Sequence, residues 1–189
     1  HSFVKGMHGV DENEIQFESG GGGLVSTMSD YYKFAYMLSN GGIGMNGQRI
    51  LSRKTLQFMT INHLPNNVDL GALSSPQYSE IGTAGSGFGL GFSVVTDPTR
   101  QGNSTSVGTF AWGGAASTYF WVDPTEDIIV IFMTQLLGNG GQNRDTIYQS
   151  LKGLPMRPMI KSIVYGSIID GGPLKTNQLF SSGTPTPKL

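Results

Sequence analysis

The sequence predicts an α+β fold in which an antiparallel β-sheet is flanked by helices. Two patterns predict it. Before residue 60, apolar residues recur at helical spacing, whereas from residue 87 onward short apolar runs are separated by turn-forming residues. Helical spacing returns after residue 142. The 189 residues suffice for one sizeable domain or for part of a larger one.

The clearest helix follows the glycine run at residues 20–23. Thr27 is a suitable N-cap, and Asp30 lies three residues later, near the positive end of the helix dipole. The run Asn40–Gly42 ends the helix. Positions i, i+3, i+4 and i+7 form one apolar face, made by Tyr31, Phe34, Ala35 and Leu38.

A second, shorter helix is predicted to begin at Ser52 and to direct Leu56 and Met59 toward the core. Residues 63–86 contain Pro, Asn, Ser and Gly without any period, so we expect a long loop there. Loops of that length are uncommon unless they have a role such as covering a site.

The strands are predicted in the middle of the chain. Gly89–Val95 forms the first strand, and Thr109–Trp112 begins the next. Ser117–Val122 and Ile128–Thr134 are predicted to form a hairpin around a turn-rich connection of five residues. The run Ile128–Met133 is apolar on both faces, which is typical of a central, covered strand.

The C-terminal part is predicted to hold two helices, over residues 143–151 and 156–170. Residues 171–189 have no periodic apolar pattern and are expected to form an extended tail. We see no internal repeat. The chain starts without an initiator Met or an apolar leader segment, which suggests a processed or truncated product.

Composition excludes several functions. Only 13% of the residues are charged and the formal net charge is −1, so no footprint for nucleic acid or an anionic membrane is present. The longest apolar run is far too short for a membrane span of about 20 residues. Without cysteine, disulfides and thiolate metal sites are excluded. No metal site is expected, since no ligand-type spacing joins His1, His8 and His63.

Other motifs give no support for a nucleotide site or a common hydrolase type. Gly42–Gly47 matches GxGxxG, but it follows a helix where a dinucleotide site needs a strand, so a helix end and turn explain it better. The nucleophile elbow GxSxG is absent, which argues against a standard α/β-hydrolase.

The sequence Trp112-Gly113-Gly114-Ala115 is the one segment that suggests chemistry. Two adjacent glycines remove side chains from one strand edge, so a substrate could lie along it and meet bare N–H groups. Backbone N–H donors that point at a developing oxyanion contribute a large part of the transition-state stabilisation in acyl transfer. The alternative is a β-bulge that packs beneath Trp112 for structural reasons alone.

Three blocks of the sequence stand out together. They are SGGGGLVSTMSDYYKFAYMLSNGG with NGQRILSRKTLQFMT, then GFGLGFSVV with WGGAASTYFWVDPTEDIIVIFMTQ, and finally IKSIVYGSIID. In order and approximate spacing these blocks resemble the serine β-lactamase-related family, which includes class C β-lactamases, family VIII carboxylesterases and related transesterases. The resemblance implies that residues 1–170 are the C-terminal portion of a domain with the β-lactamase/transpeptidase-like fold.

In that family a Ser-x-x-Lys supplies the nucleophile and its lysine, and a Tyr-x-Asn supplies a tyrosine that shuttles protons. A third box lines the opposite wall, and WGG stands where many members have Lys-Thr-Gly or His-x-Gly. The resemblance implies that the Ala115 N–H is an oxyanion-hole donor. It further implies that Trp112, Gly113 and Gly114 form the substrate-binding wall. Since Trp112 is no cation, we expect esters to be preferred to β-lactams.

The first two boxes are missing from this chain. Ser2–Lys5 has the letters Ser-x-x-Lys, but it lies too close to the glycine run to leave room for the intervening helical domain, and no Tyr-x-Asn occurs. The resemblance therefore implies a serine hydrolase for esters or amides that is incomplete, and inactive as this chain alone. Its partner would be the N-terminal portion of the same enzyme. A non-catalytic binding or assembly module and a simple fragment are the alternatives. The family's chemistry needs no cofactor.

Overall fold

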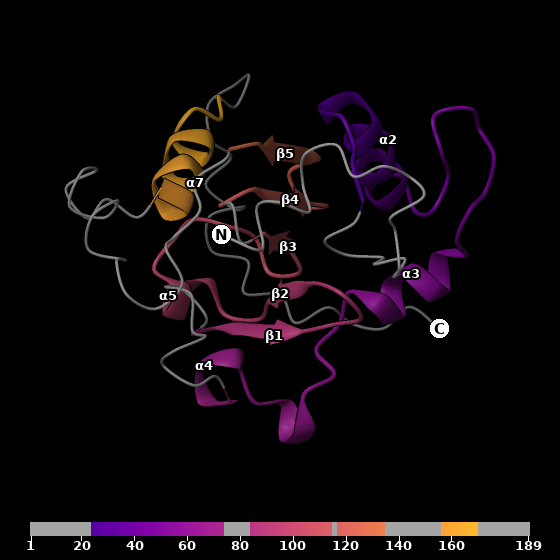
Figure 1. Cartoon of the computed structure of the whole chain (residues 1–189). Coiled ribbons are helices and arrows are strands. Elements are labelled where there is room, and N and C mark those ends of the chain that lie inside the picture. Colours follow the sequence, from indigo (N-terminus) through magenta and orange to yellow (C-terminus); the bar gives the residue numbers. More distant parts are fainter. Residues whose placement is uncertain (1–23, 74–83, 115–116, 135–155, 170–189) are drawn as a thin grey trace, which may run out of the picture.

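The computed structural model describes residues 24–73, 84–114, 117–134 and 156–169. Five strands form one sheet in the order β1-β2-β3-β4-β5, with every neighbouring pair antiparallel (Figure 1). The strands are β1 (Ser86–Phe88), β2 (Ser93–Val95), β3 (Phe110–Gly113), β4 (Tyr119–Asp123) and β5 (Ile128–Phe132). The helices are α2 (Met28–Ser39), α3 (Arg53–Met59), the 3₁₀ turn η2 (Pro65–Asn67), α4 (Leu70–Leu73), α5 (Pro98–Gln101) and α7 (Met156–Gly166).

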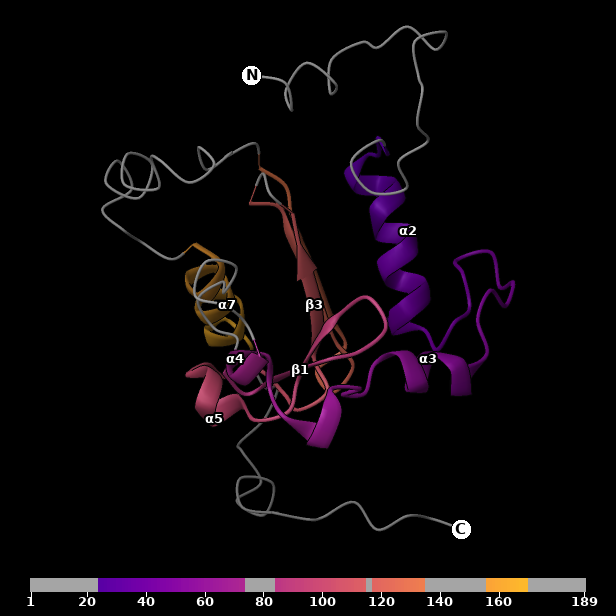
Figure 2. The ribbon, with the colours of Figure 1, turned by 60° about the horizontal axis from the view of Figure 1, so that its bottom comes forward.

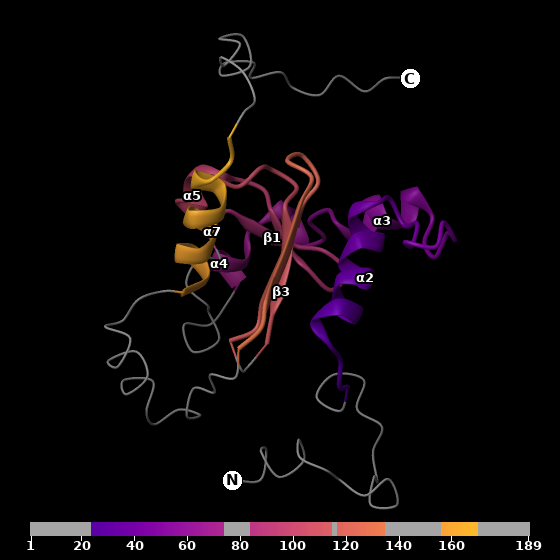
Figure 3. The ribbon, with the colours of Figure 1, turned by 90° about the horizontal axis from the view of Figure 1, so that it is seen from above.

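The sheet lies between two layers of helices. Helices α2 and α3 cover one face, while α7, α4 and α5 lie on the other side (Figures 2 and 3). We call these the α2 face and the α7 face. This arrangement confirms the predicted α+β class with an antiparallel sheet flanked by helices.

Helix α2 begins and ends as predicted. The Thr27 hydroxyl accepts a hydrogen bond from the Asp30 N–H at 3.1 Å, and Asn40 is the C-cap. Gly42, in the left-handed region at φ 90°, lies so close to the Leu51 carbonyl that a Cβ would overlap it. The same logic holds for α3, where the Ser52 hydroxyl accepts from the Thr55 N–H at 2.9 Å.

Each face of the sheet has its own hydrophobic core. On the α2 face the buried cluster joins α2, α3 and the sheet, and it consists of Ala35, Met37, Leu38, Leu56, Phe92, Val94, Phe110, Phe120 and Val122. On the α7 face a smaller cluster contains Ala111, Trp121 and Tyr165. Phe34, on the predicted apolar face of α2, is 40% exposed, and its ring makes a T-shaped contact with that of Phe120.

The predicted strand Gly89–Val95 is wrong in its first half, which is the turn of the β1–β2 hairpin. The Gly89 N–H donates to the Phe92 carbonyl at 2.8 Å, and the Leu90 N–H donates to the Met59 carbonyl at 2.9 Å. A Cβ on Gly89 would overlap that Met59 oxygen, so glycine is needed for the close approach of the two segments. The backbone of this turn therefore hydrogen-bonds to the C-terminal residue of α3 and not to a neighbouring strand.

The predicted loop over residues 63–86 is wrong in part, because it contains η2, α4 and the start of β1. The Asn62 side chain replaces the missing backbone pairing: its Oδ1 accepts from the N–H groups of Leu64 and Phe88, and its Nδ2 donates to the Val68 carbonyl. Residues 74–83 of this segment lie outside the described residues.

The β4–β5 hairpin is confirmed. Oδ1 of Asp123, at the end of β4, accepts from the N–H groups of Thr125 and Glu126 and so closes the turn. However, β5 is the last strand in the sheet order and is half-buried, so the predicted central position is wrong within the described ranges. The helix predicted over 156–170 is α7, whereas residues 143–151 and the predicted tail at 171–189 lie outside the described residues.

Candidate functional site

The predicted substrate-binding wall lies at the C-terminal end of β3. Side chains alternate along this strand, with Phe110 in the core of the α2 face and Ala111 in that of the α7 face. Trp112 therefore lies on the α2 face, where it is 47% exposed and makes a T-shaped contact with the Phe88 ring, the two ring centres being 5.1 Å apart. An exposed indole on this face could contact a ligand that lies across the end of β3.

A turn joins β3 to β4 directly after the wall. Gly113 pairs with Tyr119, and the Gly114 N–H donates to the Thr118 carbonyl at 3.0 Å, so the strands stay in register without a bulge. The Ser117 N–H donates to the Gly114 carbonyl at 3.0 Å, with Ser117 in the left-handed region. The predicted oxyanion donor Ala115 lies in this turn by sequence, outside the described residues.

The packing of neighbouring side chains explains why both positions hold glycine. A Cβ on Gly113 would overlap the guanidinium of Arg157, and a Cβ on Gly114 would overlap the Thr118 hydroxyl. The β-bulge considered from the sequence is not formed here, since Gly113 pairs in register. Substrate binding by Trp112, Gly113 and Gly114 stays a prediction.

Arg157, from the first turn of α7, reaches the β3–β4 turn. Its Nη2 donates to the Thr118 carbonyl at 3.0 Å and to the Gly114 carbonyl at 3.2 Å. The guanidinium lies 5.1 Å from the centre of the Tyr119 ring, a cation–π contact, and its burial lowers the pKa of Arg157. Sequence reasoning missed this residue because 43 positions separate it from Gly114.

A second cation, Lys161, lies one helical turn further along α7. It is only 5% exposed, and its Nζ is 5.7 Å from the Tyr119 ring centre and 5.8 Å from that of Trp121. Burial lowers the pKa of Lys161 to about 8, although the charge of Asp123 opposes this shift. The two cations of α7 thus lie against the same face of the sheet.

Asp123 anchors this buried polar cluster. Its Oδ2 accepts from the Tyr165 hydroxyl at 2.8 Å and from the Ser106 N–H at 3.2 Å. Burial tends to raise the pKa of Asp123, but these hydrogen bonds outweigh it and the net pKa is lowered. Burial raises the pKa of Tyr119 to about 12, and burial followed by the Asp123 contact raises that of Tyr165. The cluster packs against the α7 face of the sheet, and none of its side chains lines either of the two hollows between α2 and β5 described next.

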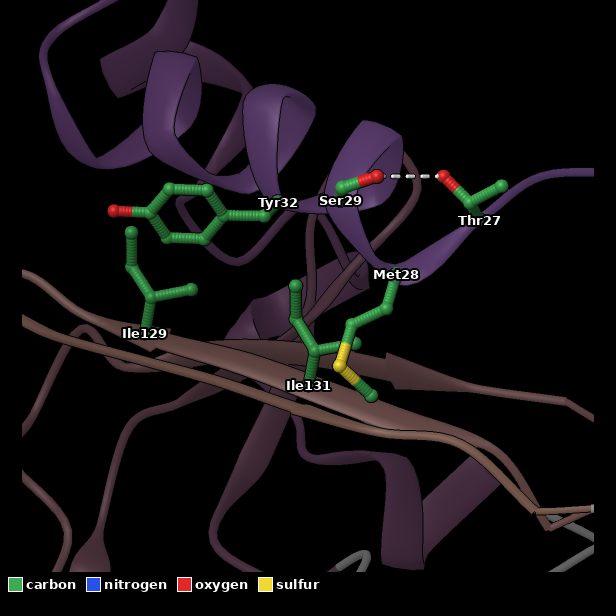
Figure 4. Close-up of a pocket in the computed structure, with 6 residues that line it drawn as sticks. All are labelled: Thr27, Met28, Ser29, Tyr32, Ile129 and Ile131. Carbon is green, nitrogen blue, oxygen red and sulfur yellow. Dashed lines mark hydrogen bonds between the residues drawn. The ribbon is translucent and has the colours of Figure 1, made fainter.

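An open apolar groove runs between α2 and β5. Figure 4 shows Met28 and Tyr32 pointing from the helix toward Ile129 and Ile131 of the strand. The groove has a volume of about 680 Å³, room for several side chains, and Met28 is 52% exposed. A more polar hollow, also lined by Tyr32 and Ile129, extends along the helix to Asp127.

The described ranges contain no group of three or more His, Cys, Asp or Glu side chains that could hold a metal ion. None of the helices in these ranges has the length and apolar character needed to span a bilayer. His63, one of the three histidines, has its Nε2 2.6 Å from the Phe58 carbonyl oxygen and its ring against that of Phe58.

Comparison with characterised structures supports the fold. The chain is similar to EstCE1, a hydrolase with promiscuous acyltransferase activity, with 26% identity and a TM-score of 0.50 over 67% of this chain and 29% of EstCE1. It is also similar to unliganded Simvastatin Synthase (LovD) from Aspergillus terreus, in a selenomethionyl derivative. There the identity is 19% and the TM-score 0.59, over 82% of this chain and 37% of LovD. The second likeness concerns the fold alone.

Sequence comparison gives the family. Two Mycobacterium tuberculosis proteins, the uncharacterized protein MT1414 (strain CDC 1551 / Oshkosh) and protein Rv1367c (strain ATCC 25618 / H37Rv), are each 35% identical to this chain over 125 residues. These matches include 63% of this chain but only 29% of each relative. The model of the Beta-lactamase family matches residues 2–153. The chain therefore belongs to the Beta-lactamase family.

Proposed function

We propose that this chain is the C-terminal part of a serine hydrolase that cleaves carboxylic esters or amides through an acyl-enzyme. The observation that carries the proposal is the end of β3, where an exposed Trp112 is followed by a tightly hydrogen-bonded turn. The similarity to EstCE1, a hydrolase with acyltransferase activity, supports the reaction class. This chain alone is inactive in the proposal, because the nucleophile belongs to another part.

In the proposed reaction, a serine of a Ser-x-x-Lys on the N-terminal portion attacks the substrate carbonyl and gives its proton to the lysine. The carbonyl oxygen becomes an oxyanion that accepts hydrogen bonds from the Ala115 N–H and from the N–H of the nucleophile. The tetrahedral intermediate expels the alcohol or amine, which receives a proton through the tyrosine of Tyr-x-Asn. Water then hydrolyses the acyl-enzyme and regenerates the serine.

The N-terminal portion is the proposed partner. This chain corresponds to 29% of the length of its curated relatives, so the remaining length could carry the two missing boxes. Among the described strands β5 is the last in the sheet, and the groove between α2 and β5, lined by Met28, Tyr32 and Ile131, offers its edge and apolar side chains for contact with the N-terminal portion. A non-catalytic assembly module would use the same surfaces but would never form an acyl-enzyme.

The substrate class can be tested on the full-length protein. We expect a fluorophosphonate probe to add to one serine outside residues 1–189, and p-nitrophenyl esters to be hydrolysed faster than cephalosporins. The reason is that Trp112 cannot pair with the carboxylate of a β-lactam as a cation would. Intact mass, peptide mapping and initial rates measure both results. An adduct on no serine would favour the assembly module, and efficient cephalosporin turnover would contradict the ester preference.

The docking surface can be tested by cysteine labelling of the full-length protein. We expect Met28→Cys to react slowly with a maleimide in the folded protein, because the N-terminal portion would cover the groove. Val107→Cys, at an exposed position away from the groove, is the matched control and should react rapidly. Rates are followed by mass spectrometry of the modified peptides. Equal rates at the two positions would show that the groove is open, against the proposal.

A further inference from the structure

We propose that Phe88 is a positioning residue for substrate binding, which holds the indole of Trp112 so that its exposed surface meets an aromatic ring of the ester. The inference rests on the proposed function, because it takes Trp112 as a residue that contacts the substrate. It adds to that function a residue outside the Trp-Gly-Gly wall and a substrate class, esters that carry an aromatic ring. Phe88 acts through Trp112 and is not itself a substrate contact.

The indole of Trp112 is both exposed and restrained. The chain has two tryptophans, and the other one, Trp121, is fully buried. The planes of the Trp112 and Phe88 rings are 73° apart, which is the T-shaped arrangement that aromatic pairs prefer. An exposed side chain turns readily about its own bonds, so this contact favours one orientation of the indole. The surface that Phe88 leaves uncovered stays available to a ligand.

Phe88 is suited to this role because both of its backbone polar groups are fixed. Its N–H donates to Oδ1 of Asn62 at 3.0 Å, and its carbonyl accepts from the His63 N–H at 2.8 Å. A Cβ on Gly87 would overlap the Asn62 side chain, so glycine lets this amide lie against β1. On the other edge of β1, Phe88 pairs with Ser93 of β2. The Phe88 ring therefore projects from a backbone that is held on both edges.

The Asn62 side chain is itself held in place. Besides Phe88, its Oδ1 accepts from the Leu64 N–H at 3.1 Å. Its Nδ2 donates to the Val68 carbonyl and to Oδ1 of Asn67, each at 2.9 Å. An amide oxygen has two lone pairs and an amide nitrogen two N–H groups, so every hydrogen-bonding position of Asn62 is filled. The support of Phe88 is thus a saturated network that leaves Asn62 a single orientation.

An ordered indole strengthens the binding of a substrate that lies against it. Affinity falls in proportion when only a fraction of the protein has the competent conformation. The energy of one aromatic pair corresponds to a change of about 2- to 10-fold in that fraction. The indole contacts the substrate in the ground state and in the transition state alike, so its disorder raises KM and leaves kcat unchanged.

The first test measures hydrolysis by the full-length protein of three esters that differ in where they carry a ring. Ethyl phenylacetate has it on the acyl side, benzyl acetate on the alcohol side, and ethyl acetate has none. We expect Phe88→Leu to raise KM about 2- to 10-fold for at least one ring-bearing ester, without a change in kcat. Ethyl acetate should be unaffected. Unchanged KM values for both ring-bearing esters would overturn the inference, and a lower Tm would then make Phe88 merely structural.

Two further variants serve as controls. Phe88→Tyr keeps an aromatic ring and should keep the native KM. Phe58→Leu is the matched control, because Phe58 is also an exposed phenylalanine in a T-shaped contact, but with His63. It should leave the kinetics of all three esters unchanged. An equal rise of KM in Phe58→Leu would assign the effect to the segment around His63 and contradict the role of the Phe88 ring.

Replacing Trp112 by alanine separates this inference from the proposed function. Trp112→Ala should raise KM for the ester that responds to Phe88→Leu, and Phe88→Leu should add little in the Trp112→Ala background. A further rise there would make Phe88 a substrate contact and overturn the positioning role. Unchanged kinetics in Trp112→Ala would refute the proposed substrate contact. A rise in Trp112→Ala without one in Phe88→Leu would refute only the role of Phe88.

A spectroscopic measurement tests the orientation of the indole without catalysis. In the full-length protein with fluorinated tryptophan, the Trp112 resonance is identified by its loss in Trp112→Phe. We expect Phe88→Leu to shift or broaden this fluorine resonance and Phe58→Leu to leave it as it is. The same resonance in Phe88→Leu and in the native protein would overturn the inference. A failure of the native protein to hydrolyse any ester would instead refute the proposed function.

Discussion

Replacing Ala115 by proline is expected to lower kcat for ester hydrolysis by the full-length protein by about 10²- to 10³-fold, with KM near the native value. Proline has no N–H and cannot stabilise an oxyanion. The donor is used mainly when charge develops on the carbonyl oxygen, so its loss affects the transition state more than the bound substrate. Steady-state kinetics with a p-nitrophenyl ester measures both constants.

The control for this substitution is Ala116→Pro, which introduces proline into the same turn but retains the Ala115 N–H. Thermal unfolding of both variants checks that the fold persists. We expect Ala116→Pro to keep most of the native kcat. Equal losses in the two variants would assign the effect to a disturbed turn and would contradict the proposed donor.

Replacing Lys161 by methionine is expected to stabilise the protein at pH 7, by about 1–3 kcal/mol. Burial lowers the pKa of Lys161 from 10.5 to about 8, so at pH 7 the folded state carries a poorly solvated charge. Methionine keeps the packing against Tyr119 and Trp121 without that charge. Chemical denaturation at pH 7 measures the difference in the free energy of unfolding.

The native protein should also become more stable as the pH rises from about 8 to 10. In this interval Lys161 has lost its proton in the folded state but keeps it in the unfolded state, so the unfolded state binds more protons. Above pH 10 the trend reverses, because the raised pKa values of Tyr119 and Tyr165 keep them protonated only when folded. Lys161→Met should lack the rise, whereas Lys54→Met, at an exposed position on α3, should retain it. A rise that persists in Lys161→Met would contradict this assignment.

Local signals in the sequence predicted much of the fold. The caps Thr27 and Ser52 and the turn after Asp123 act through hydrogen bonds to residues two or three positions away, so their effect is visible in the sequence itself. The turn between β1 and β2 was wrongly predicted as strand, because the need for glycine at position 89 comes from the Met59 carbonyl of helix α3, which is distant in the sequence. Local patterns also could not predict where β5 lies in the sheet, because its apolar run is equally typical of a central strand.

At the candidate site, too, local features could be predicted from the sequence, whereas contacts between distant residues could not. The sequence predicted that Gly113 and Gly114 leave a strand edge bare for a substrate, and this stays a prediction. In the structure the space beside the two glycines is occupied by the Arg157 guanidinium and the Thr118 hydroxyl. Arg157 could not be named from the sequence, because it comes from a distant helix and no spacing rule connects it to the turn. Predicting the contact would have required knowledge of how α7 crosses the sheet.

The order of the strands has a consequence for how the chain folds. Within the part of the chain that the structure describes, each strand in β1-β2-β3-β4-β5 pairs with strands adjacent to it in the sequence and with no others. Such pairing closes short loops, which have a low entropic cost and favour rapid folding. Helix α2 is different, since Ser39 meets Asp127 across 88 positions. We therefore expect the sheet to assemble early from its own hairpins, and the docking of α2 to be the slower step that completes its second face.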